Sequence, residues 1–162
     1  MRHFPELYYF IAIVVAVIVF SLITLVAVNC GADEIDMSII AQIESSNNPD
    51  AYNVLSKATG IYQMRKIAWI DVQNHYPKLK KYSYKYAFDK TITTIFAEKY
   101  FCILHKYMTY YKIPPTTTNY LIAYHDGIGN LRKYLAGKRQ LGNEMKGYIG
   151  KYILLDKQKL LV

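Results

Sequence analysis

The chain has 162 residues, of which 52% are hydrophobic and 20% are charged, and its formal net charge is +8. This length fits one domain, and the absence of any fixed-period repeat in the sequence excludes a solenoid. No recognisable nucleic-acid-binding module accompanies the positive charge. Anionic lipid headgroups and a cell-wall glycan are therefore favoured over nucleic acid as partners. An AT-rich genome would explain the same lysine excess without any such partner.

An apolar run opens the chain. Residues 7–28 contain no charged side chain, and these 22 residues at helical rise would span roughly 33 Å, enough to cross the hydrocarbon core of a membrane. The run is longer than the core of a typical cleaved signal. Arg2 precedes it and acidic residues follow it, which favours an N-terminus inside the cell. We therefore expect residues 1–33 to be a single-pass anchor or uncleaved signal in the cell membrane, and residues 34–162 to be one extracytoplasmic domain, in the periplasm or on the cell-wall side.

The two cysteines are expected in different surroundings. Cys30 directly follows the apolar run and is a possible lipid-attachment site, but Asn29 stands where such sites have a small residue. Cys102 falls in a helical stretch at an expected core position, where cysteine behaves as a small hydrophobe. Because one cysteine is expected at the membrane and the other inside the domain, no disulfide is expected.

The first helix of the domain is expected over residues 36–44. Three isoleucines fall at helical spacing there, and Asp36 or Ser38 is available to cap the start. The helix is expected to end near Ser46, because the sequence NNP at residues 47–49 is a helix breaker.

The remainder of the domain is also expected to be helical. Asp89 is a suitable cap for the strongest apolar periodicity in the chain, which continues to Tyr111. The sequence HDGIGN at residues 125–130 is expected to form a turn. Because no segment alternates with a period of two, the domain is predicted to be mainly α. The other expected helices cover residues 63–75, a stretch capped by Thr118 that runs to Tyr124, and residues 144–155.

Glu44 carries the chemistry that the sequence indicates. It continues the stripe of Ile40 and Ile43, so its carboxyl group is expected at the edge of apolar packing. Desolvation disfavours the charged form and raises the pKa of a carboxylic acid, which then donates a proton near neutral pH. From its position alone, a solvated glutamate at a helix end remains the alternative.

Three short blocks resemble the signatures of a known family. "ESSNNPDA" at residues 44–51, "GIYQM" at 60–64 and "AYHDGIGN" at 123–130 are similar to the blocks of the soluble lytic transglycosylases, which are related to goose-type lysozyme. They occur in the family's order and at nearly its spacing, and the resemblance covers about residues 36–152. It implies a lysozyme-like, mainly α, lytic transglycosylase domain behind one N-terminal transmembrane helix.

The resemblance assigns roles to the first two blocks. Glu44 corresponds to the catalytic acid, and Ser45 to the serine that helps to hold the carboxyl group or a substrate amide. Gln63 corresponds to the glutamine that faces the sugar, and Met64 to the apolar residue beside the cleft. Gly60 is expected to need a positive φ or a close backbone approach, because a turn must deliver Gln63 to the cleft.

The third block and the tail supply further binding residues. Tyr124 corresponds to the family tyrosine whose hydroxyl contacts the catalytic carboxylate, and Tyr148 to a late tyrosine near the cleft. The family usually has asparagine after this first tyrosine, whereas this chain has His125, which preserves the hydrogen bond or marks a different subsite. Trp69 either stacks on a sugar or fills the core, and the core is favoured.

The resemblance also implies a reaction. Glu44 protonates the glycosidic oxygen between N-acetylmuramic acid (MurNAc) and N-acetylglucosamine (GlcNAc), the substrate's acetamido group stabilises the cationic centre, and the 6-hydroxyl closes a 1,6-anhydro ring. One carboxylate suffices, so no metal and no cofactor are expected, whereas many glycosidases need two carboxylates. Asp126 lies closest to a signature block. It keeps open a hydrolysing, lysozyme-like outcome.

Two alternatives to a lytic transglycosylase remain. A hydrolytic muramidase would act on the same peptidoglycan strands with water. A wall-docking component of a secretion, conjugation or phage-entry machine would bind glycan with little catalysis, although the intact Glu44 argues against a dead enzyme.

Overall fold

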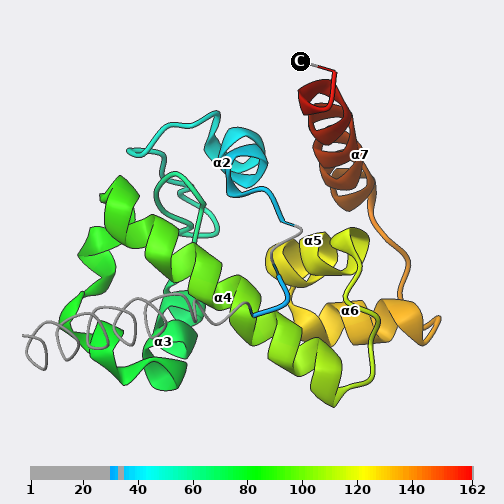
Figure 1. The fold of residues 1–162 in the computed structure, drawn as a ribbon, viewed down its shortest axis with the longest axis horizontal. Coiled ribbons are helices and arrows are strands. Elements are labelled where there is room, and N and C mark those ends of the chain that lie inside the picture. Colours follow the sequence, from blue (N-terminus) through cyan, green and yellow to red (C-terminus); the bar gives the residue numbers. More distant parts are fainter. Residues whose placement is uncertain (1–29, 33–34, 162) are drawn as a thin grey trace, which may run out of the picture. The chain divides into compact units, whose positions relative to one another are not determined.

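Figure 1 shows the computed structural model of the protein, which describes residues 30–32 and 35–161. The apolar run at residues 7–28, and with it the predicted membrane anchor, lies outside the described residues. Within the described part of the chain, no helix combines the length and the apolar character needed to span a bilayer.

The described part of the chain is mainly helical, as predicted. It forms no strand, and its β pairing is limited to isolated bridges from Thr59 to Tyr52 and to Met64. In chain order its elements are α2 (Met37–Ser45), α3 (Lys66–His75), the 3-10 helices η1 (Pro77–Lys81) and η2 (Tyr84–Phe88), α4 (Lys90–Tyr110), α5 (Thr117–Asp126), α6 (Ile128–Leu135) and α7 (Asn143–Lys159).

Helix α2 begins and ends where the sequence predicts. The Asp36 carboxylate accepts a hydrogen bond from the Ser38 backbone N–H at 2.8 Å, which satisfies one of the free donors at the helix start. Ser46 ends the helix in the left-handed conformation, with φ of 55°. Ile39 and Ile40 are buried beneath it, so the apolar stripe fixes how the helix rests on the domain.

Helix α4 is the scaffold of the domain. Asp89 caps it as predicted, accepting from the Ile92 N–H at 2.9 Å. Figure 1 shows α4 crossing the domain, with α3 on one side of it and α5 and α6 on the other. Trp69 of α3 is 1% exposed and stacks on Phe96 of α4, with ring centroids 3.5 Å apart. Trp69 therefore fills the core and does not bind a sugar.

Three local expectations are corrected by the structure. The predicted turn at residues 125–130 contains the start of α6. Only Gly127, with φ of 89°, departs from helical conformation, and α6 begins at the next residue. The cap of α5 is Thr116 and not Thr118. Helix α3 begins at Lys66 and not near residue 63, because Gln63 has a positive φ of 45°.

The expectation about the cysteines is wrong. Cys30 and Cys102 are both disulfide-bonded, and the chain has no other cysteine. The sequence argument placed Cys30 at the membrane, away from the domain. However, the Tyr120 hydroxyl of α5 donates a hydrogen bond to the carbonyl of Gly31 at 2.9 Å, so the residue after Cys30 is part of the domain. A sulfur in a disulfide is not available for lipid attachment.

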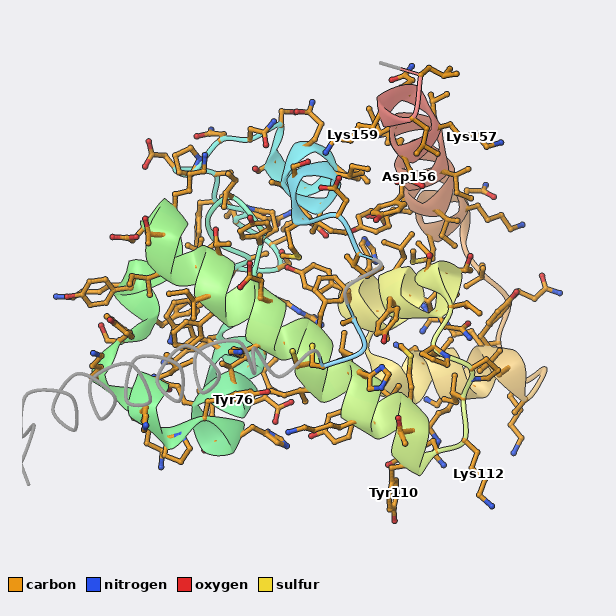
Figure 2. The ribbon with its side chains drawn as sticks, in the orientation of Figure 1. Tyr76, Tyr110, Lys112, Asp156, Lys157 and Lys159 are labelled. Atoms are coloured by element: carbon orange, nitrogen blue, oxygen red, sulfur yellow. The ribbon has the colours of Figure 1, made fainter. Side chains whose placement is uncertain are left out.

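Helix α7 is fastened to the start of α2. The Asp36 backbone N–H donates to the Tyr152 hydroxyl at 2.8 Å, and the Lys159 ammonium contacts the Asp36 carboxylate at 2.5 Å. Figure 2 shows Lys159 on the side of α7 that faces α2, whereas Lys157 points away. These contacts hold the C-terminal helix where its first half can border the site described next.

Candidate active site

A cleft of about 620 Å³ runs between α2, the segment that follows it, the start of α3 and the first half of α7. The six predicted site residues that line it are Glu44, Gln63, Met64, Tyr124, His125 and Tyr148. Ser45, the seventh, lies behind the cleft wall. Residues that the sequence separates by more than one hundred positions therefore share one surface.

The Glu44 carboxyl group lines this cleft. It projects from the last turn of α2, is half-buried, and accepts a hydrogen bond from the Tyr148 hydroxyl at 2.8 Å. Burial raises the pKa of Glu44 to about 7, although the hydrogen bond from Tyr148 and the electrostatic interaction with His125 act in the opposite direction. Near neutral pH the group is therefore present both as an acid and as a carboxylate.

The two predicted tyrosines differ in what their hydroxyls do. The Tyr124 hydroxyl donates to the carbonyl of Tyr62 at 2.7 Å, and its ring stacks on Phe101 with centroids 4.7 Å apart. The contact with the carboxylate that was expected of Tyr124 is thus made by Tyr148. Burial and the nearby Glu44 charge raise the pKa of both tyrosines, so the Tyr148 hydroxyl keeps its proton and remains a donor.

Ser45 holds the wall of the cleft in place from behind. Its hydroxyl lies 2.8 Å from the carbonyl of Ile61 and 3.2 Å from that of Ala41. The first contact joins the end of α2 to the segment at residues 60–64. In the structure Ser45 therefore positions backbone, and it contacts neither the carboxyl group nor the cleft.

The segment at residues 60–64 has the unusual backbone that its glycine predicts. Gly60 has φ of 77°, and a Cβ atom there would lie 1.8 Å from the carbonyl oxygen of Ala87, so both expected reasons for a glycine are confirmed. Gln63 donates its side-chain N–H groups to the carbonyls of Gly60, at 2.9 Å, and Ala51, at 3.2 Å. Met64, 2% exposed, forms part of the apolar floor.

Tyr84 supports this segment and was not found from the sequence. Its hydroxyl lies 2.7 Å from the carbonyl of Met64 and 3.0 Å from both the carbonyl of Lys57 and the hydroxyl of Thr59. It thus joins the two sides of the loop that presents Gln63. The chain has 17 tyrosines, and Tyr84 stands in a run of lysines and tyrosines that gives no sign of a buried hydroxyl.

His125 borders the cleft at the end of α5 and has acidic neighbours. Its Nδ1 lies 2.9 Å from Oδ1 of Asp126, and its Nε2 lies 3.8 Å from Oε1 of Glu144. Asp126 is also paired with Arg139 at 3.0 Å and does not line the cleft. No group of three or more metal-binding side chains occurs among residues 30–32 and 35–161.

Comparison with known proteins identifies the family. The family model described as "Transglycosylase SLT domain" matches residues 26–145, which are 120 of the 162 residues, and confirms the resemblance seen in the three blocks. No curated protein and no solved structure matches the chain. Tyr148, the hydrogen-bond donor to Glu44, follows the matched residues. The chain belongs to the transglycosylase SLT domain family, whose members are lytic transglycosylases that cleave glycosidic bonds of peptidoglycan.

Proposed function

We propose that this lytic transglycosylase is anchored in the membrane and cleaves the β-1,4 bond between MurNAc and GlcNAc, with Glu44 as general acid and then general base. The products have 1,6-anhydro-muramoyl ends. One observation carries the proposal: the Glu44 carboxyl group lines a cleft of about 620 Å³ and accepts a hydrogen bond from the Tyr148 hydroxyl at 2.8 Å. Its burial there raises its pKa to about 7. Such a group holds a proton for a leaving oxygen at neutral pH.

The first step uses Glu44 as an acid. Because the Tyr148 hydroxyl donates to Oε1 of Glu44, Oε1 serves as the carbonyl oxygen of the protonated group and Oε2 carries the proton. That proton passes to the glycosidic oxygen as the bond from this oxygen to C1 of MurNAc breaks. The acetamido oxygen of MurNAc then bonds to C1 and takes up the positive charge.

The second step uses the same residue as a base. The Glu44 carboxylate, stabilised by the Tyr148 bond, accepts the proton of the MurNAc 6-hydroxyl. The 6-oxygen bonds to C1, the bond from the acetamido oxygen to C1 breaks, and Glu44 is protonated again. The cycle therefore needs no second carboxylate and consumes no water.

The rest of the cleft suits a glycan. Its walls combine hydrogen-bonding side chains, which match the hydroxyl and acetamido groups of the sugars, with an apolar floor against which sugar rings pack. The polar group includes Asn53, Ser56 and Asn143, and the apolar group includes Met64 and Ile67.

An extracytoplasmic location fits two further features. The apolar run at residues 7–28 has the length of a membrane-crossing helix. Both cysteines are disulfide-bonded, and disulfides persist in oxidising compartments outside the cytoplasm. These features support a domain that is held at the cell membrane and faces the peptidoglycan.

The test is digestion of purified peptidoglycan sacculi by the wild-type protein and by Glu44→Gln, followed by mass spectrometry of the released muropeptides. We expect products that lack one water per new end, and loss of cleavage in the variant by at least about 100-fold, because general acid catalysis contributes roughly 10²–10⁴-fold. Glu98→Gln, an exposed position on α4 outside the cleft, is the matched control. Unchanged cleavage by Glu44→Gln would disprove the proposal, and purely hydrated ends would assign a muramidase instead.

A role as a wall-docking part of a secretion, conjugation or phage-entry machine would need glycan binding without cleavage. The same digestion decides this, because a docking protein binds sacculi without releasing muropeptides. The position of Glu44 in the cleft, paired with a hydroxyl donor, favours the enzyme.

A further inference from the structure

A chain of charged groups orients His125 beside the cleft. Arg139 contacts Oδ2 of Asp126 at 3.0 Å, and Oδ1 of the same carboxylate lies 2.9 Å from Nδ1 of His125. The Asp126 side chain is only 16% exposed, so it is shielded from solvent. The guanidinium group and the imidazole ring thus contact different oxygens of one carboxylate, and Oδ1 selects which imidazole nitrogen carries the hydrogen.

This arrangement leaves one nitrogen of His125 as a proton acceptor. With the hydrogen on Nδ1 directed at Asp126, the lone pair of the neutral ring is on Nε2. His125 lines the same cleft as Glu44 and Tyr148, and its ring centroid lies 5.0 Å from that of Tyr148. The reaction described above uses neither His125 nor Asp126, so a second oriented base in the cleft has no assigned role.

We propose that His125, positioned by Asp126, activates a water molecule in the cleft, so that the enzyme releases hydrated muramoyl ends beside anhydro ends. The inference rests on the proposed function, because it acts on the intermediate that Glu44 generates. Water bonds through its oxygen to C1 of MurNAc, and its proton passes to Nε2 of His125. The bond from the acetamido oxygen to C1 breaks, and solvent then takes the proton from His125 and returns one to Glu44.

Other groups near His125 are less suited to this role. Glu144 lines the cleft with Oε1 at 3.8 Å from Nε2 of His125, but its side chain is 87% exposed and freely solvated. The Tyr148 hydroxyl is occupied as a donor to Glu44. Asp126 does not line the cleft and acts on water only through His125.

The test measures the ratio of hydrated to anhydro ends in a single digest of sacculi, since this ratio does not depend on how much active enzyme is present. For His125→Asn we expect the ratio to fall by roughly tenfold or more, since a general base contributes about 10²–10⁴-fold and asparagine accepts no proton near neutral pH. Asp126→Asn should lower the ratio in the same direction. His75→Asn is the matched control, because His75 pairs with Asp71 in a similar way but lies on α3 outside the cleft.

The possible results separate this inference from the proposed function. Wild-type digests without hydrated ends, or an unchanged ratio in both the His125 and the Asp126 variants, would overturn the inference and leave Glu44 as the acid. A ratio that falls only in Glu144→Gln would also overturn it, by making Glu144 the base. Full activity of Glu44→Gln would instead remove the proposed function on which the inference rests.

Discussion

The hydroxyl of Tyr148 donates to Oε1 of Glu44 at 2.8 Å, and this bond joins α7 to the end of α2 across 104 positions of sequence. It acts on both forms of the carboxyl group. In the acid it fixes which oxygen carries the proton, and in the carboxylate it stabilises the negative charge. The donor comes from a helix that lies largely beyond the residues matched by the family, so α7 completes the catalytic surface.

Replacing Tyr148 with phenylalanine should shift the pH dependence of cleavage. The hydrogen bond lowers the pKa of Glu44, so its loss should raise that pKa above about 7. The alkaline limb of the pH profile for sacculus cleavage should move to higher pH, while the maximal rate falls by roughly fivefold, since one hydrogen bond is worth about 1 kcal/mol. Tyr110→Phe, at the exposed end of α4 labelled in Figure 2, should change neither quantity. If the alkaline limb of the Tyr148→Phe profile stays in place, the hydrogen bond does not set the pKa of Glu44.

The Glu44→Gln variant should be more stable than the wild type at alkaline pH. The pKa of Glu44 is about 7 in the folded protein and 4.5 in its ordinary state. Between these values the folded protein binds more protons than the unfolded chain, so the contribution of Glu44 to stability is complete below pH 4.5 and is lost as the pH rises through 7. At pH 8 the free energy of unfolding should increase by up to about 3 kcal/mol in the variant, since one pKa unit is worth about 1.4 kcal/mol.

Urea unfolding at pH 4 and at pH 8 measures this difference. At pH 4 both proteins carry an uncharged group at position 44, so the curves should lie close together. A variant that is less stable than the wild type at pH 8 would contradict the buried environment of Glu44. If the variant is more stable than the wild type at pH 8, the result also shows that the wild-type protein keeps Glu44 at a cost in stability.

Local signals explain why much of the fold was predictable. The caps Asp36 and Asp89 act on backbone groups two or three residues away. The sequence identified Asp89 directly and Asp36 as one of two candidates. The stripe of Ile40 and Ile43 placed Glu44 at the edge of the core because helical spacing alone determines which residues share a face. The three sequence blocks then brought most of the cleft residues into one prediction.

Contacts between distant segments explain what was missed. Tyr124 and Tyr148 are both buried near Glu44, and only the packing of α7 against α2 and α5 decides which hydroxyl reaches the carboxylate. The bonding of the cysteines was missed for a similar reason. It depends on Gly31 lying against Tyr120 of α5, whereas the sequence shows only an apolar run that ends just before Cys30.

Replacing Tyr84 with phenylalanine should loosen the loop that presents Gln63. The change removes a hydroxyl within hydrogen-bonding distance of Met64, Lys57 and Thr59. The Met64 carbonyl keeps the hydrogen bond from the Thr59 N–H at 3.0 Å. The variant therefore loses hydrogen bonds worth about 0.5–1.5 kcal/mol each, so thermal unfolding should shift by a few degrees and cleavage should weaken. The ring itself, which packs edge-on to Trp69, is retained.

Tyr86→Phe is the matched control for this loop, because Tyr86 stands two residues further along η2 with a 36% exposed side chain. Differential scanning calorimetry and the rate of muropeptide release should separate the two variants. Equal melting temperatures and equal rates would show that the Tyr84 hydroxyl does not hold the loop.

Among glycine-to-alanine substitutions in the described part of the chain, Gly60→Ala should damage the cleft most. The added Cβ would lie 1.8 Å from the carbonyl oxygen of Ala87, which belongs to the backbone and cannot rotate away. The left-handed conformation alone costs a non-glycine residue about 1–2 kcal/mol, and the clash must in addition displace η2 or the loop that carries Gln63. Both outcomes move Gln63 relative to Glu44, so cleavage should fall together with stability.

For Gly150→Ala we expect the opposite effect on stability. Gly150 lies within α7, and nothing lies within 4 Å of the added atom. Alanine there should therefore stabilise the helix by about 0.5–1 kcal/mol. Chemical denaturation of both variants, with muropeptide release measured in parallel, checks the pair, and a Gly60→Ala protein with wild-type stability and activity would show that the loop has another backbone path.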